Sequence, residues 1–367
     1  MRQRRLAVTA CALFACSDAP PPFQTAANYP IDPNPQSSAV VDVNGDGKAD
    51  VVFATTSGPG QLDILLGDGN GALGVKAQAH GASNLYGLAV ADFNGDKHPD
   101  LASSEQLGAS VEVFVNAGDG TFGAPVNSTV GGSCNPRSLV AADFNIDGKQ
   151  DLAVLCDQSS TFVVLLGTGT GAFLAPLATS AGTRAAVSIA TADLNGDGKP
   201  DLVLGAFGTD NLGEVDLLLG RGNGAFGPPA SLPIMGRPTV AIGDTNQDGV
   251  LDVVVRFGLV VQVILGSGQG SYSTAATGSF GADFDPNALL LLDVDGDHIP
   301  DLAGTNPNAG NLSVAKGDGV GGFGAEELIP MASNPTALSA GDLNGDGKPD
   351  FVAGNGAGDR AYVVLSK

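Results

Sequence analysis

The nonapeptide DVNGDGKAD, residues 42–50, decides the fold because the chain repeats its pattern six more times. The other copies are DFNGDKHPD from Asp92, DFNIDGKQD from Asp143, DLNGDGKPD from Asp193, DTNQDGVLD from Asp244, DVDGDHIPD from Asp293 and DLNGDGKPD from Asp342. Successive copies begin 49 to 51 residues apart. So constant a period indicates one supersecondary unit repeated seven times, and periods of about 40 to 50 residues with several strands each are typical of β-propeller blades.

Each unit contains four short β-rich runs separated by turns. In the third unit they are SLVAAD before the acidic nonapeptide, DLAVLC after it, FVVLLG, and a segment that opens with Phe173 after the glycine turn TGTGA. Runs as apolar as FVVLLG are typical of strands buried on both faces. We therefore expect an all-β, seven-bladed β-propeller of four-stranded blades.

An aromatic residue follows the glycine turn in five units. These residues are Phe122, Phe173, Phe226, Tyr272 and Phe323. Because they recur at a fixed place in the repeat, we interpret them as packing wedges between blades rather than as a stacking surface for a ligand.

The two ends of the chain look like two parts of one blade. The last unit stops after AYVVLSK, without a glycine turn or a fourth run, whereas PPFQTAANY near the start resembles a lone fourth strand that opens at Phe23. We expect the N-terminal strand to complete the last blade, which closes the ring and removes open sheet edges.

The charge of the chain is concentrated in the nonapeptides. Of its 39 Asp and Glu, 22 lie in the seven copies, which leaves 17 acids against 17 Lys and Arg elsewhere. A net charge of -22 excludes a protein that binds nucleic-acid phosphates. Acids confined to periodic loops need counter-ions, and divalent cations suit them.

The first residues, MRQRRLAVTACALFAC, have the form of a bacterial export signal: three Arg, then an apolar run too short to span a membrane. We expect a signal over 1–15, a tether over 16–22 and the propeller over 23–367. Leu13 to Cys16 resembles a lipoprotein box, so we expect lipid on Cys16 and a cell-envelope or cell-surface location. The alternatives are ordinary cleavage without lipid, which gives a secreted protein, or a start that is not cleaved.

Two further cysteines, Cys134 and Cys156, flank the first hairpin of the third unit. If the hairpin pairs in register they come close together. The sequence leaves open whether they form a disulfide or stay as two thiols.

The nonapeptide carries the oxygen ligands of a calcium loop. Asp at the first and fifth places, Asn or Asp at the third, and usually Gly at the sixth let a tight loop wrap around Ca²⁺. An EF-hand is excluded because its twelfth place requires Glu before a helix, and here that place holds residues such as Phe53 and Ser103 within predicted strands. A further carboxylate stands at the ninth place.

On these residues the chain resembles the FG-GAP or VCBS repeat family, whose repeats form the propeller at the N terminus of integrin α subunits. The resemblance covers residues 23–367. It implies up to seven structural Ca²⁺ ions, each bound by the side chains at places one, three, five and nine and by the backbone carbonyl at place seven, such as that of Lys48. The implied side-chain ligands are Asp42, Asn44, Asp46, Asp50, Asp92, Asn94, Asp96, Asp100, Asp143, Asn145, Asp147, Asp151, Asp193, Asn195, Asp197, Asp201, Asp244, Asn246, Asp248, Asp252, Asp293, Asp295, Asp297, Asp301, Asp342, Asn344, Asp346 and Asp350.

The sequence favours a binding role over catalysis. It has no GxSxG, HExxH or GxxxxGK[ST] motif, and its constant period leaves no insertion to hold catalytic residues. We expect a non-catalytic, monomeric adhesion or scaffold module with a protein or matrix partner; a propeller-type polysaccharide lyase or hydrolase with structural calcium is the alternative. The candidate partner-binding segments are the irregular connections 55–61, 103–110, 207–214 and 306–311.

Overall fold

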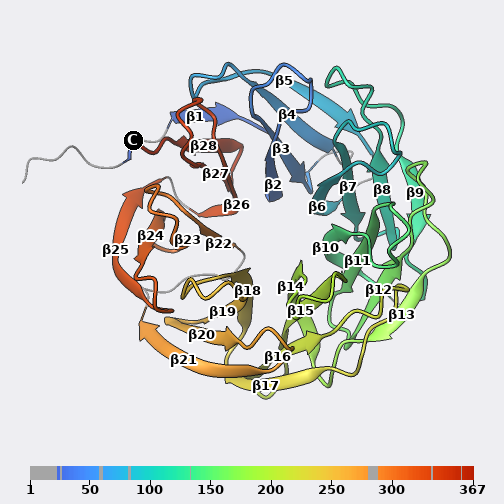
Figure 1. The fold of residues 1–367 in the computed structure, drawn as a ribbon. Helices are drawn as coiled ribbons and strands as arrows, with labels where there is room; N and C mark the ends of the chain where they lie inside the picture. The colour runs from blue at the N-terminus through green and yellow to red at the C-terminus, as the bar shows by residue number, and fades with distance from the viewer. Residues whose placement is uncertain are drawn as a thin grey trace, which may run out of the picture.

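The computed structural model describes residues 23–24, 27–57, 61–81, 84–132, 134–279, 288–331, 334–356 and 358–367. These residues form seven four-stranded antiparallel sheets arranged as blades around a central axis (Figure 1). The expected seven-bladed β-propeller is confirmed. The expected export signal, tether and Cys16 lie outside the described residues. Within them, no helix is long and apolar enough to cross a membrane.

Each blade runs outward from its first strand, nearest the axis, to its fourth strand at the rim. The first strands are β2 (Pro35–Val41), β6 (Leu85–Ala91), β10 (Pro136–Ala142), β14 (Ala185–Ala192), β18 (Pro238–Gly243), β22 (Leu289–Leu292) and β26 (Pro335–Gly341). The second strands are β3 (Asp50–Thr55), β7 (Asp100–Glu105), β11 (Asp151–Cys156), β15 (Asp201–Phe207), β19 (Asp252–Phe257), β23 (Asp301–Asn306) and β27 (Asp350–Asn355).

The outer half of each blade contains the third and fourth strands. The third strands are β4 (Gln61–Gly67), β8 (Ser110–Phe114), β12 (Thr161–Leu165), β16 (Leu212–Leu218), β20 (Val260–Gly266), β24 (Asn311–Gly317) and β28 (Arg360–Val364). The fourth strands are β5 (Leu73–His80), β9 (Val126–Thr129), β13 (Leu177–Ser180), β17 (Ala230–Met235), β21 (Tyr272–Ser279), β25 (Phe323–Pro330) and β1 (Ala27–Pro30). We number the blades 1 to 7 from the blade that begins with β2.

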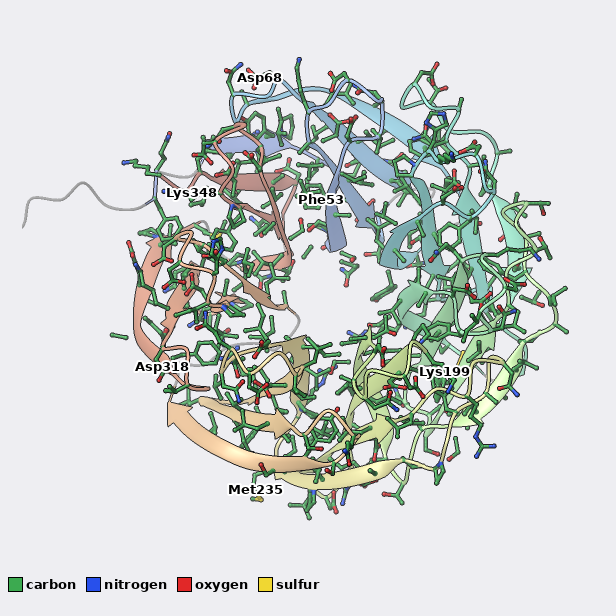
Figure 2. All side chains as sticks on the ribbon, viewed as in Figure 1. Phe53, Asp68, Lys199, Met235, Asp318 and Lys348 are labelled. Atoms are coloured by element: carbon green, nitrogen blue, oxygen red, sulfur yellow. A yellow bond between two sulfur atoms is a disulfide. The ribbon has the colours of Figure 1, made fainter. Side chains whose placement is uncertain are left out.

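The second and third strands form the core because neighbouring blades cover both of their faces. Every residue of β3, β7 and β11 is buried, whereas β13 at the rim is mostly exposed. In Figure 2, Phe53 of β3 lies within the ring of blades, and Met235 of β17 lies on the outer rim. Burial on both faces explains why the third run of each unit in the sequence is almost wholly apolar.

The ring closes as the two ends of the sequence predict. Strand β1 pairs antiparallel with β28, so the fourth strand of blade 7 comes from the N-terminal end of the chain. Phe23 also forms an isolated bridge with Ser366. The same bridge joins Phe173 to Gly167 in blade 3, so Phe23 occupies the place of the aromatic residue after the glycine turn.

These aromatic residues pack between blades. The ring of Phe173 in blade 3 lies edge-on to Phe93 of blade 2, with centroids 5.9 Å apart. Phe226 of blade 4 contacts Phe144 of blade 3 in the same manner, at 5.7 Å. The interpretation of these residues as packing wedges is confirmed for both pairs.

Cys134 and Cys156 form a disulfide, which settles the question that the sequence left open. Cys156 ends β11, opposite Pro136 of β10, and Cys134 lies two residues before Pro136. The bond therefore ties the connection into blade 3 to the second strand of that blade.

Candidate metal centres

The seven acidic loops all lie on one face of the propeller, because each connects the first strand of a blade to the second. We number them with the blades, and we call their nine residues places one to nine. Places one to eight form the turn, and place nine is the first residue of the second strand. The spacing of the sequence thus puts one loop at the same end of every blade.

The first-place Asp organises each loop. In loop 4, Asp193 accepts hydrogen bonds from the backbone N–H groups of Asp197, at 3.1 Å, and of Gly198, at 2.7 Å. The bond from the sixth-place N–H to the first-place carboxylate occurs in all seven loops, at 2.7 to 2.9 Å. It folds the chain tightly around the first-place side chain.

The third- and fifth-place side chains also accept backbone hydrogen bonds. In loop 4 the amide oxygen of Asn195 accepts from Asp197, and Asp197 accepts from Lys199, each at 3.0 Å. Both bonds recur in all seven loops. These bonds fix the direction of the oxygen atoms at places one, three and five before any ion arrives.

The ninth-place Asp has a different environment. Asp201 of loop 4 is fully buried, and its two oxygens accept from Leu194 at the start of the loop, at 3.0 Å, and from Gly220 beyond the third strand, at 2.6 Å. All seven blades repeat this pair of bonds. This carboxylate therefore clamps three segments of its own blade together.

Burial also shifts the ionisation of the ninth-place Asp. It raises the pKa of Asp50, Asp100, Asp151, Asp201, Asp301 and Asp350 above the ordinary value, and that of Asp151 to about 6. In loop 3, the carboxylates of Asp143 and Asp147 raise the pKa of Asp151 further. A buried carboxylate beside other carboxylates is stabilised in its charged form by a cation.

Two loops lack Gly at the sixth place and two at the fourth, yet all keep the same turn. Lys97 and His298 at place six have φ of 73° and 67°, and Ile146 and Gln247 at place four both have φ of 59°. These are left-handed conformations that cost free energy for residues with a side chain. The network of backbone hydrogen bonds is strong enough to impose them.

The donor set suits a hard divalent cation. Carboxylate and amide oxygens from places one, three and five are the ligands that Ca²⁺ prefers, and each oxygen that accepts one backbone bond keeps a further lone pair. Among the described residues, one group of three carboxylates has ligand atoms all within 4.8 Å of one another, namely Asp293, Asp295 and Asp297 of loop 6. The residues present therefore fit a metal ion.

The loops also connect neighbouring blades. The N–H of Gly171, in the glycine turn of blade 3, donates to the carbonyl of Phe93 at place two of loop 2, at 2.9 Å. Gly224 bonds Phe144 in loop 3 in the same manner, and Gly71 bonds Leu343 in loop 7 across the ring closure. An ion that stabilises a loop would consequently stabilise the contact with the next blade.

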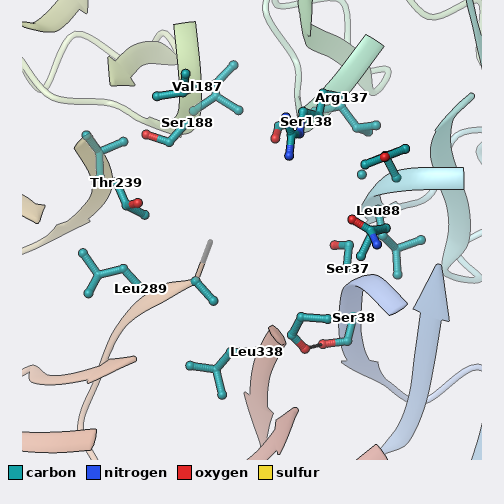
Figure 3. Close-up of a pocket in the computed structure, with 18 of the residues that line it drawn as sticks. Ser37, Ser38, Leu88, Arg137, Ser138, Val187, Ser188, Thr239, Leu289 and Leu338 are labelled. Carbon is teal, nitrogen blue, oxygen red and sulfur yellow. Dashed lines mark hydrogen bonds between the residues drawn. The ribbon is translucent and has the colours of Figure 1, made fainter. Parts of the chain in front are cut away.

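The opposite face carries the mouth of the central channel. A cavity of about 270 Å³ is lined there by the beginnings of all seven first strands. Figure 3 shows the labelled side chains around its open centre, among them Arg137, Ser188 and Thr239. The guanidinium of Arg137 lies 5.6 Å from the ring centre of Tyr86 and 3.6 Å from Asp157.

Three of the irregular connections expected to bind a partner, 103–110, 207–214 and 306–311, also lie on this opposite face, and residues 58–60 of the fourth, 55–61, lie outside the described residues. Each joins the second strand of a blade to its third, at the end of the blade remote from the acidic loop. In the connection between β7 and β8, the side chain of Leu107 is 73% exposed. The structure thus separates the candidate metal face from the candidate partner face.

Sequence reasoning missed several buried acids outside the loops, among them Asp63, Glu112 and Asp216. Asp216 in the middle of β16 is fully buried, one of its oxygens accepts a hydrogen bond from Ser231, and the other has no hydrogen-bond partner in the described structure. Burial raises its pKa to about 6. An Asp within the apolar run VDLLLG was the available signal.

Residues 42–103, 92–154, 144–204, 193–255 and 293–353 match the FG-GAP-like repeat family, and the chain belongs to this family. Together the five matches include all seven loops. This confirms the family resemblance that the nonapeptides indicate.

Solved structures with the same fold have low sequence identity to this chain. BBS1N in complex with ARL6DN, soaked with mercury, is similar with a TM-score of 0.64 and 14% identity over 94% of this chain and 97% of that chain. An Agrocybe aegerita lectin that recognises non-reducing terminal N-acetylglucosamine has a TM-score of 0.55 and 18% identity, over 89% and 86%. A functionally unknown protein from Desulfotomaculum acetoxidans has a TM-score of 0.55 and 13% identity, over 81% and 89%. The comparison with curated proteins found no match.

Proposed function

We propose that this protein is an exported, calcium-binding β-propeller that acts as a non-catalytic binding, adhesion or scaffold module at the cell surface. The observation that carries the proposal is the hydrogen-bond network that recurs in all seven loops and holds the oxygen atoms of places one, three and five in the same arrangement in each. The ions are structural: they neutralise the loops and hold each blade against the next.

Calorimetry in EDTA, in calcium and in magnesium tests the metal. Extracellular calcium modules bind with Kd of about 10⁻⁴ to 10⁻³ M. At millimolar calcium and the tighter end of that range, each site contributes about 1.4 kcal/mol. We expect EDTA to lower the melting temperature by many degrees and calcium to restore it. Equal melting in all three solutions contradicts the metal proposal, and full recovery with magnesium alone contradicts the choice of calcium.

The partner face is proposed to be the face opposite the metal loops. It carries the irregular connections, the channel mouth and the exposed side chain of Leu107. Two solved structures with this fold are described as a protein complex and as a sugar-recognising lectin, which supports a binding role for the fold.

A paired substitution tests the face. Leu107→Asp should abolish binding of the calcium-loaded protein to its native cell surface. Met235→Asp introduces the same charge at a 66% exposed place on the outer rim and should leave binding unchanged. Equal loss in both variants, or in neither, contradicts the assignment.

The lipid anchor is proposed at Cys16, which follows an Arg-rich start and an apolar run. Labelling with a fatty-acid analogue should mark the wild-type protein and not Cys16→Ser. If both label equally, or neither labels, the anchor is absent and the protein is secreted without lipid.

A further inference from the structure

Loop 6, residues 293–301, differs from the other six loops in its charge. Its third place holds Asp295, whereas the third place of every other loop holds Asn. Loop 6 therefore has four carboxylates and the other loops have three. If the loops bind the same ion, the additional charge should make loop 6 the tightest site.

A second difference in blade 6 accompanies the first. Lys316 lies near the end of β24, immediately before Gly317, whose N–H donates to the ninth-place Asp301 at 2.9 Å. The residue in the same position of the other six blades is aliphatic: Leu66, Val115, Leu166, Leu219, Leu265 and Leu365. The one loop with an additional carboxylate is thus also the one loop with an ammonium group in this position.

The aliphatic residue elsewhere packs against the glycine turn of the next blade. Leu166 approaches Gly224 so closely that a Cβ atom added to this glycine would lie 2.8 Å from the Leu166 side chain. In the same way, a Cβ atom added to Gly71 would lie 2.4 Å from the side chain of Leu365. Blade 7 has no glycine turn, because β28 and β1 come from opposite ends of the chain. An aliphatic residue at position 316 would have no such turn to cover.

A cavity of about 130 Å³ lies at this junction instead. Its lining includes Phe23 and Ser366 of blade 7 and Asp295, Asp301 and Lys316 of blade 6. Ring closure therefore leaves room beside loop 6 for a long, charged side chain.

Lys316 uses that room to contact the additional carboxylate. Its Nζ lies 2.6 Å from Oδ2 of Asp295. The hydrogen bond raises the pKa of Lys316 and lowers that of Asp295, so both groups are held in their charged forms. In loops 1, 3 and 4 an ammonium also contacts a loop carboxylate, but it comes from place seven of the loop itself and contacts the fifth-place Asp: Lys48 with Asp46, Lys149 with Asp147 and Lys199 with Asp197.

We propose that Lys316 is a built-in counter-ion that weakens calcium binding at loop 6 and so offsets the affinity that the additional carboxylate would give this site. The inference rests on the proposed calcium sites. An incoming Ca²⁺ must compete with the ammonium for Asp295, and the two cations repel each other a few ångströms apart. Even in a medium as polar as water, that repulsion corresponds to about ten-fold in affinity.

The three histidines of the chain provide a site-resolved measurement. His298 is at place six of loop 6, with its Nδ1 3.4 Å from Asp293, and His98 is at place seven of loop 2. His80 ends β5 on the opposite face. In protein labelled with ¹³C-histidine, NMR at constant pH follows the His298 signal for loop 6, the His98 signal for loop 2, and the His80 signal as a control for global change.

We expect the His298 signal in the wild type not to respond at lower calcium than the His98 signal, in spite of the additional carboxylate of loop 6. Lys316→Met keeps the length of the side chain without the charge, and should move the His298 midpoint to about ten-fold lower calcium while the His98 midpoint stays unchanged. Lys316→Arg keeps the charge and should leave both midpoints as in the wild type. Asp295→Asn combined with Lys316→Leu gives loop 6 the composition of the other loops and should bring its midpoint close to that of loop 2.

The outcomes separate this inference from the proposed function. If neither loop signal responds to calcium, the calcium sites themselves are contradicted. If both respond but Lys316→Met leaves the His298 midpoint in place, or Lys316→Arg moves it as far as Met does, the counter-ion role is overturned and the calcium sites stand.

Discussion

Phe23 and Ser366, near opposite ends of the chain, form a β-bridge that closes the ring of blades. Gln24 extends the contact, because its N–H donates to the carbonyl of Leu365 at 2.9 Å. Phe23 is buried, and its ring centre lies 6.1 Å from that of Phe351. The N-terminal segment is thus integrated into blade 7 in the way that an internal fourth strand is integrated into its own blade.

Phe23→Ala should therefore destabilise the whole domain. Truncation of a buried Phe costs about 3 to 5 kcal/mol. Phe226→Ala, in the equivalent place of blade 4, is the matched control, because Phe226 is buried and bridges Gly220. Denaturant unfolding should give similar losses for both variants. A loss for Phe226→Ala alone would show that the N-terminal segment is not docked.

The first- and ninth-place aspartates should have separable roles. In EDTA, Asp201→Ala leaves two backbone N–H groups in the blade without their acceptor, and should lower the free energy of unfolding by about 3 kcal/mol. Asp193 lies in the exposed part of the loop, where water can replace its carboxylate as the acceptor, so Asp193→Ala should lower the free energy of unfolding by less than about 1 kcal/mol in EDTA. In calcium, this variant should in addition lose the stabilisation from one calcium site, about 1.4 kcal/mol. Urea unfolding with and without calcium measures both effects. If Asp201→Ala and Asp193→Ala lose the same free energy of unfolding in EDTA, the two aspartates do not have separate roles.

Asp216 should make stability depend on pH. Burial, with a smaller contribution from the nearby Glu214, raises its pKa to about 6. The folded state then binds the proton more tightly than the unfolded state, so this stabilising contribution is present below the ordinary pKa and is lost as the pH rises through about 6. Asp216→Asn should remove that loss and be more stable than the wild type at pH 7.5.

The opposite sign is expected for Asp210. The ion pair and hydrogen bond with Arg184 lower the pKa of Asp210 to about 2, so its contribution is present above the ordinary pKa and is lost as the pH falls. Urea midpoints should be compared between pH 2 and 8: Asp216→Asn should gain on the wild type as the pH rises towards and through about 6, and Asp210→Asn should fall behind the wild type as the pH rises from about 2 to the ordinary pKa. Parallel curves for the wild type and Asp216→Asn would contradict the role of the buried carboxylate.

Lys97→Gly should stabilise the protein by about 1 kcal/mol, because Lys97 has φ of 73° and Gly adopts this conformation without strain. Gly198→Ala in loop 4 is the reverse control: an added Cβ meets no atom within 4 Å there, so its cost comes from the backbone alone. Thermal unfolding in EDTA, where no ion contributes, should show opposite shifts. If Lys97→Gly leaves the melting temperature unchanged, the turn is not strained at this residue.

The sequence by itself determined the architecture, because the information is local and repeated. Strand-forming runs and glycine turns recur at a constant period, and a lone fourth strand at Phe23 complements a last unit that lacks one. Seven copies of the same short-range pattern admit one closed arrangement, and the acidic loops are defined by residues within nine positions of each other.

Only the tertiary structure decided what depends on side-chain direction and on contacts between distant segments. It paired Cys134 with Cys156, and it buried Asp201 as a clamp between backbone segments rather than exposing it beside the other loop acids. It also brought Lys316 to Asp295, 21 residues away, in the space left by ring closure. A nine-residue pattern states which oxygens a loop contains, but the packing of strands and neighbouring blades decides which of them face solvent and which cation lies beside them.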